Sequence, residues 1–216
     1  EVPAVGGGIF SIVVQDFNGD GITDFAVGYF DCRLSFYRGL DGSQFELVRT
    51  VAFTYESRVM TTGDFDQDGD YDIAGAGYAG DVVVLENGGD LLTRTERRRD
   101  YRAGSGKIGT REIKATDLNG DGDLDLLIGT GDGVMVYHGG GGTSFALSSE
   151  KVPGTEFPAS SIVTSDFDND GIEDLAVSCR VLSCVIVLKG DAAGNFVPAL
   201  TVDVPAGEFI RTGDID

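Results

Sequence analysis

A nine-residue acidic motif that recurs four times constrains this chain more than any other feature of its 216-residue sequence. The pattern reads D-x-[DN]-x-D-G-x-x-D, and its copies span residues 16–24, 64–72, 117–125 and 166–174. Successive copies start 48, 53 and 49 residues apart, and a fifth start at Asp214 follows after another 48 residues. Self-similarity at such a period indicates an architecture built from repeated supersecondary units.

Oxygen-bearing side chains occupy the odd positions of every copy. In a tight loop, alternate side chains can converge on one point, where three or four carboxylates would repel each other without a cation. Calcium accepts six to eight oxygen ligands in flexible geometry, whereas magnesium requires a small octahedron and keeps its waters. The motif therefore predicts about four Ca²⁺ ions, one in each loop.

Position six of the motif is glycine in all four copies, at Gly21, Gly69, Gly122 and Gly171. A loop that wraps around an ion needs a sharp reversal, and glycine adopts positive φ without steric cost. Position seven varies between Ile and Asp, as expected where only the backbone carbonyl binds the ion. The reversal and the ion are thus predicted to depend on different positions of the same loop.

The first half of the motif is also typical of an EF-hand loop, which needs a bidentate Glu at position twelve and a helix on each side. Position twelve holds no such ligand, being Val27, Gly75, Ile128 or Val177, and the flanking segments are rich in β-forming residues. We therefore place each loop in a strand-to-strand turn. The alternative is that Asp, Asn and Gly merely make good turns, but four copies in one register favour an ion.

Short apolar runs surround each loop, and no helical period occurs along the chain. They predict an all-β fold, namely a β-propeller built of four-stranded antiparallel blades. The blades are expected at residues 10–57, 58–107, 108–158 and 159–208, with a partial fifth at 209–216. We expect residues 1–216 to form a single propeller domain or a fragment of one. The outer strand of the second blade is predicted near Leu91–Arg97.

The net charge of −20 bears on which kinds of partner this chain can bind. Fourteen of the 36 acidic residues are Asp at positions predicted to bind through the side chain, and four divalent ions would bring the charge to −12. Nucleic-acid binding depends on basic patches, so we expect no nucleic-acid partner. No run of eighteen apolar residues occurs, so we expect no membrane span.

Cys179 and Cys184 flank a predicted hairpin tip. They could form a disulfide or remain two free thiols, and the sequence leaves both alternatives open. Cys32 has no evident partner.

The run D-F-N-G-D-G-I-T-D-F-A-V from Asp16 and its three siblings resemble the FG-GAP / VCBS repeat found in integrin α-subunit propellers. The resemblance covers nearly the whole chain, and it implies a calcium-binding β-propeller that is usually extracellular. In that family, the ion is held by the side chains at positions one, three, five and nine and by the carbonyl at position seven. Carried over to this sequence, the metal ligands are Asp16, Asn18, Asp20, Ile22, Asp24, Asp64, Asp66, Asp68, Asp70, Asp72, Asp117, Asn119, Asp121, Asp123, Asp125, Asp166, Asp168, Asp170, Ile172 and Asp174.

The function that this resemblance favours is a secreted or cell-surface module for adhesion, which binds glycans or protein partners on a propeller face. Tyr29, Phe30 and Tyr78 follow the second strands and could stack on sugars or pack inside a blade. One alternative is a structural assembly unit that self-associates through strand donation into the unfinished fifth blade. Another is a carbohydrate-active enzyme of the polysaccharide-lyase kind. We favour it less, because the chain has a single histidine, His138, and no Ser-His-Asp constellation.

Overall fold

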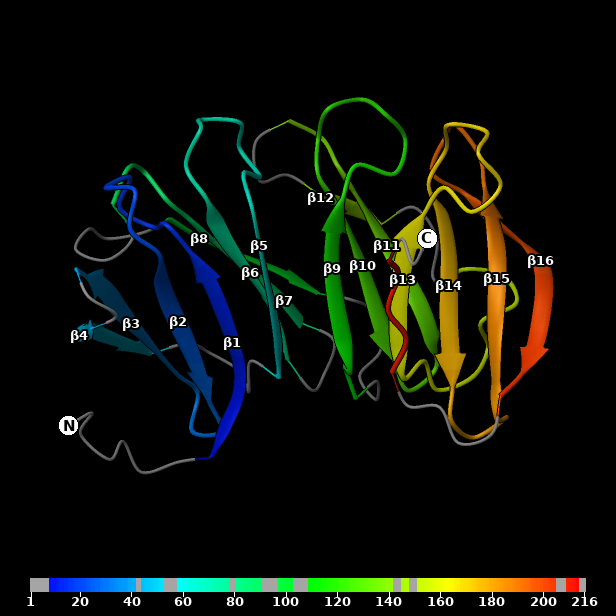
Figure 1. The fold of residues 1–216 in the computed structure, drawn as a ribbon, viewed down its shortest axis with the longest axis horizontal. Coiled ribbons are helices and arrows are strands. Elements are labelled where there is room, and N and C mark those ends of the chain that lie inside the picture. The colour runs from blue at the N-terminus through cyan, green and yellow to red at the C-terminus, as the bar shows by residue number, and fades with distance from the viewer. Residues whose placement is uncertain are drawn as a thin grey trace. The chain divides into compact units, whose positions relative to one another are not determined.

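A computed structural model describes residues 8–41, 44–52, 58–77, 81–90, 97–102, 109–141, 145–147, 151–204 and 209–213. Within these ranges the chain forms four antiparallel sheets of four strands each and no helix (Figure 1). It divides into two compact units, the first containing β1 to β8 and the second β9 to β16. The predicted all-β class is confirmed. Since no helix occurs in the described ranges, they also contain no candidate for a helical membrane span.

The first unit contains two sheets, each a simple meander in which every strand pairs with the next one along the chain. One sheet consists of β1 (Ile9–Gln15), β2 (Asp24–Tyr29), β3 (Arg33–Leu40) and β4 (Gln44–Ala52). The other consists of β5 (Val59–Gly63), β6 (Asp72–Ala76), β7 (Asp81–Glu86) and β8 (Arg97–Arg102).

The second unit repeats this organisation. Its first sheet consists of β9 (Glu112–Thr116), β10 (Asp125–Thr130), β11 (Gly133–Gly139) and β12 (Phe145–Leu147). Its second sheet consists of β13 (Ser161–Ser165), β14 (Asp174–Cys179), β15 (Cys184–Gly190) and β16 (Phe196–Asp203). Four-stranded meanders of this kind are the units from which propeller blades are made.

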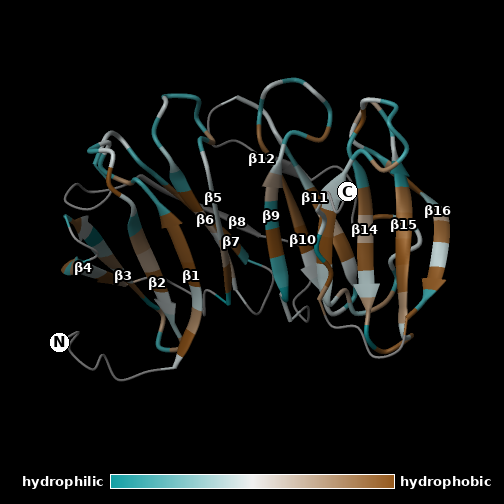
Figure 2. Ribbon diagram, viewed as in Figure 1, coloured by the Kyte–Doolittle hydropathy of each residue, from teal (hydrophilic) through white to brown (hydrophobic). Residues whose placement is uncertain are grey.

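The second strand of each sheet is its most buried element. All residues of β6, β10 and β14 are buried, whereas β16 is exposed after Phe196. A strand covered on both faces is apolar throughout rather than alternating, which matches runs such as Leu126-Leu127-Ile128. In Figure 2, β14 and β15 are largely brown, while the loop that precedes β14 is largely teal.

In each unit the first strands of the two sheets contact each other, β1 with β5 and β9 with β13. The Met60 backbone N–H donates to Ser11 Oγ at 3.1 Å, and the Ile162 N–H donates to a Glu112 carboxylate oxygen at 2.9 Å. Apolar side chains fill the space between the paired sheets. The first unit buries Val13, Phe17, Ala26, Leu34, Phe36, Met60, Ile73, Val83 and Leu85 in one cluster.

The outer strand of the second sheet differs from its predicted place. We expected it near Leu91–Arg97, but β8 runs Arg97–Arg102 and pairs Arg97 with Glu86. The segment carries several charges and no apolar alternation, so pairing with β7 rather than pattern defines it. Residues 91–96 lie outside the described ranges.

The three cysteines are free thiols. Cys179 and Cys184 are buried and lie directly opposite each other at the ends of β14 and β15. Burial, with a smaller contribution from Cys179, raises the pKa of the Cys184 thiol.

Candidate metal centre

Each copy of the acidic motif connects the first two strands of one sheet. We number them loops 1 to 4, for residues 16–24, 64–72, 117–125 and 166–174. Position nine is in every case the first residue of the second strand, at Asp24, Asp72, Asp125 and Asp174. The loops therefore share one topological place, as the sequence predicted from their flanks.

The position-nine carboxylates are buried and accept two backbone N–H groups each. Oδ2 accepts from position two of the same loop at 2.8 to 3.0 Å. Oδ1 accepts from a residue at the end of the third strand at 2.6 to 2.9 Å, these residues being Gly39, Asn87, Gly139 and Gly190. One carboxylate thus ties three segments of the sheet together, whether or not a cation is present.

The carboxylates at positions one and five organise the turn itself. Position one accepts the N–H of the position-six glycine on Oδ2 at 2.8 to 3.0 Å. Position five accepts the N–H of position seven on Oδ1 at 2.8 to 3.0 Å. Because these bonds recur in all four loops, they hold the backbone of every loop in one similar conformation.

Two positions of the loop adopt positive φ, although the sequence indicated only one. The position-six glycines have φ between 82° and 95°. Position four has φ between 59° and 72° in Gly19, Gln67, Gly120 and Asn169. Asparagine tolerates this left-handed region better than most residues do, and glycine adopts it freely. The preference for Gly and Asn at position four was the available signal.

Gly69→Ala should cost about 1–2 kcal/mol, because φ at this position is 95° and an L-residue resists it. A Cβ added at Gly69 would meet no atom of the described residues within 4 Å, so the cost is conformational. Gly88→Ala is the matched control, since its Cβ is equally unobstructed and its φ lies outside the positive range. Urea denaturation of both variants in calcium measures the difference, and equal stabilities would contradict the assignment.

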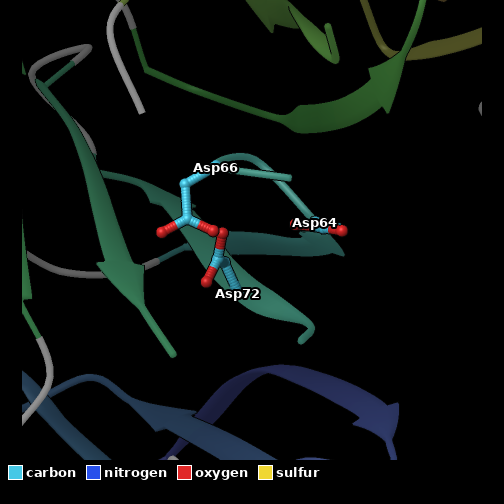
Figure 3. Close-up of side chains that lie close together, drawn as sticks. All are labelled: Asp64, Asp66 and Asp72. Atoms are coloured by element: carbon cyan, nitrogen blue, oxygen red, sulfur yellow. The ribbon is translucent and has the colours of Figure 1, made fainter. Parts of the chain in front are cut away.

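Three carboxylates converge in loop 2 and again in loop 4. One oxygen from each of Asp64, Asp66 and Asp72 lies within 4.8 Å of the others (Figure 3). The same holds for Asp166, Asp168 and Asp174 in loop 4. These are positions one, three and nine of the motif, so the turn of the folded loop brings the last carboxylate back beside the first two.

Loops 1 and 3 carry Asn at position three, and its amide takes part in the turn. Nδ2 of Asn18 donates to Asp20 at 3.0 Å, and Nδ2 of Asn119 donates to Asp121 at 2.9 Å. The Asp123 N–H, the Asn119 amide and, more weakly, His138 hold the pKa of Asp121 below its usual value. Position five of loop 3 is therefore ionised and available to a cation.

In loop 2, burial raises the pKa of two carboxyl groups, in contrast to the lowered pKa of Asp121 in loop 3. It raises the pKa of Asp72 to about 7, although two N–H donors oppose the rise. Burial and the Asp68 charge raise the pKa of Asp66, and Glu86 adds to the effect. A pKa of about 7 leaves the Asp72 carboxyl partly protonated near neutral pH when no cation is bound, so binding a divalent ion there would release protons.

A further set of residues lies at the end of the third strand, and sequence reasoning missed it; three of the four act on their loop, whereas Arg38 lies 4.0 Å from Glu46. Arg38, Glu86, His138 and Lys189 each stand directly before the N–H that donates to position nine. His138 Nδ1 lies 3.2 Å from Asp125 Oδ1. The Lys189 ammonium contacts Asp168 and lies 2.8 Å from Asp170 Oδ2, and it holds the pKa of Asp170 below its usual value. Their similar spacing from position nine, 13 to 15 residues further along the chain, was the signal that could have found them.

The donor set fits a hard divalent cation. It consists of oxygens alone, and in loop 2 Asp66 Oδ1 is buried without a hydrogen-bond partner among the described residues. Side chains at positions one, three, five and nine would hold the ion with the position-seven carbonyl, and the ion would supply the charge that the carboxylates lack. Loops 2 and 4 bring three of these groups together, whereas in loops 1 and 3 the Asn amide at position three donates to the position-five carboxylate.

The aromatic side chains considered for sugar stacking divide in two. Tyr29 is buried, and its hydroxyl lies 3.3 Å from that of Tyr37. Phe30 is half exposed and contacts the Phe10 ring. Tyr78 lies outside the described residues.

In the second unit, a pocket of about 640 Å³ adjoins loop 4 and is lined by Ser165, Asp166, Phe167, Asn169, Arg211, Thr212 and Gly213.

The four sheets and their loops define the class of this protein. It is a repeat protein in which each propeller-like, four-stranded sheet carries one acidic loop between its first two strands. The model of the FG-GAP-like repeat matches residues 16–75 and 117–177, each match containing two of the four loops. Since the matches cover more than half of the chain, this protein belongs to the FG-GAP-like repeat family.

Solved structures with similar folds come from several kinds of protein. BBS1N in complex with ARL6DN matches with a TM-score of 0.66 and 10% identity over 94% of this chain and 59% of that one. An Agrocybe aegerita lectin, described as recognising non-reducing terminal N-acetylglucosamine, matches with a TM-score of 0.57 and 21% identity over 87% and 50%. The chain thus spans 59% and 50% of the two matched chains, and at these identities the likeness concerns the propeller-like fold alone.

Proposed function

We propose that this chain is a calcium-stabilised β-propeller module that binds glycans or protein partners outside the cell or on its surface. The observation that carries the proposal is the fourfold recurrence of one all-oxygen loop at the same topological place in four similar sheets. The glycan recognition described for the Agrocybe aegerita lectin, together with the complex formed by BBS1N, supports a binding role on such a scaffold.

The ions act on structure in this proposal. Each would neutralise the carboxylates of one loop, three of which already lie close together in loops 2 and 4, and would thereby join the first two strands of a sheet. Residues exposed around the loops, such as the position-eight Tyr71, then present a fixed surface to a ligand. Calcium need not touch the ligand for binding to depend on it, because binding requires the folded scaffold.

Ion counting tests the metal part of the proposal. Native mass spectrometry in a calcium-containing volatile buffer should show about four ions per chain. Asp121→Ala should remove one ion because its carboxylate is a proposed ligand, whereas Asp123→Ala should remove none because position seven offers its carbonyl. A wild-type chain without bound calcium, or equal ion loss in the two variants, would overturn this assignment.

A glycan array tests the ligand part. The chain should bind a restricted set of glycans in calcium and lose them in EDTA, and Phe30→Ala should weaken binding if its exposed ring stacks on sugar. Phe45→Ala is the matched control, with a ring 49% exposed on the outer strand β4. New ultraviolet absorbance from uronic-acid polysaccharides would instead reveal a lyase. Absence of any glycan ligand would favour a protein partner.

A further inference from the structure

The four loops differ in the charge that faces them from the end of the third strand. This third-strand position is Arg38 in loop 1, Glu86 in loop 2, His138 in loop 3 and Lys189 in loop 4. The residue after it donates its N–H to position nine in every loop. The side chains of Glu86, His138 and Lys189 act on their loops, whereas Arg38 lies 4.0 Å from Glu46 of β4. Loops 2 and 4 give the most direct comparison, because they carry opposite charges there and have the same four Asp side chains at positions one, three, five and nine.

In loop 4 a cation from the chain itself meets the predicted ligands. The Lys189 ammonium contacts Oδ2 of Asp168, at position three, and lies 2.8 Å from Oδ2 of Asp170, at position five. The lysine side chain is 45% exposed and reaches the loop across the space between β15 and the turn. It therefore neutralises part of the same group of oxygens that a divalent ion would occupy.

In loop 2 the corresponding residue adds negative charge. Glu86 is 5% exposed and contributes to the negative potential at Asp66. Loop 2 also carries four Asp at positions one, three, five and nine, and its Asp66 Oδ1 is buried without a hydrogen-bond partner in the described ranges. Loops 2 and 4 thus have the same four ligand side chains and differ in the neighbouring charge.

We propose that Lys189 is a built-in counter-ion of loop 4, which a divalent cation must displace from Asp168 and Asp170 before it binds. The inference rests on the proposed calcium binding and extends it: the loops have unequal affinities, with loop 2 the tightest and loop 4 the weaker of the two four-Asp loops. A single positive charge about 5 Å from a divalent ion reduces affinity roughly tenfold even in water. As calcium falls, the ion leaves loop 4 first of these two, and the ammonium keeps the turn folded.

Calcium titrations of the full chain, followed by isothermal calorimetry and native mass spectrometry, test this order. Lys189→Met should tighten one weak site roughly tenfold, whereas Lys189→Arg should keep the wild-type affinity because it keeps the charge. Arg180→Met is the matched control. It removes the same charge from the same sheet but lies in the turn at the opposite end of β14, about 20 Å away along the strand, beyond the screening length at physiological salt.

Two further variants assign the effect to its loop. Asp166→Asn weakens loop 4 itself, so the site that Lys189→Met tightens should be the same one that Asp166→Asn weakens, and the other sites should keep their affinities in both variants. Glu86→Gln should weaken one of the tightest sites while leaving the ion count at saturating calcium unchanged.

The outcomes separate this inference from the proposed function. Four ions in the wild type with no change of affinity in Lys189→Met, or a loss of affinity, would overturn the counter-ion role and leave calcium binding intact. The same gain in Arg180→Met would also overturn it, because net charge would then explain the effect. A wild type that binds no calcium would overturn both.

Discussion

Removal of calcium should lower the melting temperature of this chain by about 20 °C or more. If each ion is bound with a dissociation constant about a hundredfold below the free calcium concentration, each site adds about 2.7 kcal/mol. Four independent sites add on the order of 10 kcal/mol, which is comparable to the whole stability of a typical domain. For a chain of this size, 1 kcal/mol corresponds to roughly 2–4 °C.

Repulsion in the empty loops adds to that loss. Three carboxylate oxygens lie within 4.8 Å of one another in loops 2 and 4. Of these two loops, loop 4 has the Lys189 ammonium in contact with it, whereas loop 2 has Glu86 at the same position. We therefore expect loop 2 to be the part of the chain that loses order first in EDTA.

Thermal melting followed by circular dichroism measures this effect. The same sample is scanned in calcium, in EDTA at equal ionic strength, and after calcium is restored in excess. Magnesium in place of calcium should recover only part of the shift, because it requires a small octahedron and retains its waters. A melting curve that is the same with and without EDTA would show that the loops are only well-made turns.

The repeat made the architecture predictable from the sequence. Four copies in one register placed the loops, and apolar runs on both sides placed the strands. The burial of all residues in β10 and β14 follows directly from runs such as Leu126-Leu127-Ile128. Local chemistry and global fold agree here, because every loop begins and ends at the same point of its sheet.

Contacts between segments distant in sequence were not predictable in this way. A Cβ at Gly190 would lie 2.1 Å from the Glu173 carbonyl oxygen, and Gly39 and Gly139 meet the same obstacle. In the second sheet Asn87 takes this place and donates from Nδ2 to the Tyr71 carbonyl and to the Phe17 carbonyl of the neighbouring sheet. Neither the close packing of these glycines nor the hydrogen bonds of Asn87 produce a repeating pattern in the sequence. Both depend on where another strand of the folded sheet ends.

The approach of Lys189 to its loop was hidden for the same reason. Asp174 and Lys189 are separated by fifteen residues, and only the pairing of β14 with β15 brings the end of the third strand back to the loop. The outer strand β8 was displaced from its prediction because pairing with β7, not apolar alternation, determines its position. Side-chain pattern locates buried strands well and exposed, charged strands poorly.

Asp24→Ala should destabilise the chain by about 2–6 kcal/mol more than Asp20→Ala does at the same calcium concentration. Both substitutions remove a proposed ligand of loop 1, so both should lose that ion. Asp24 is also the buried acceptor for the Phe17 N–H at 3.0 Å and the Gly39 N–H at 2.8 Å. Its loss leaves two buried donors unpaired, at about 1–3 kcal/mol each.

The comparison separates the metal from the backbone. Asp20 is exposed, and water can replace its hydrogen bonds to the Ile22 N–H and the Asn18 amide. Native mass spectrometry should therefore show the same loss of one ion in both variants, and urea denaturation should show the extra cost in Asp24→Ala alone. Equal free energies of unfolding would mean that the N–H groups find other partners and that position nine serves the ion only.

The extra cost should lie toward the lower end of this range. Burial raises the pKa of Asp24, with smaller contributions from Asp20 and Asp16, so the folded chain already opposes its ionisation. Replacing it by Ala removes that penalty while it removes the two acceptors. A buried carboxylate is stable when it accepts two N–H groups and also binds a cation. A buried carboxylate without the cation, or two buried N–H groups without the carboxylate, would each destabilise the fold. This mutual dependence explains why the acidic motif keeps the same residue at position nine in all four loops, although position seven varies.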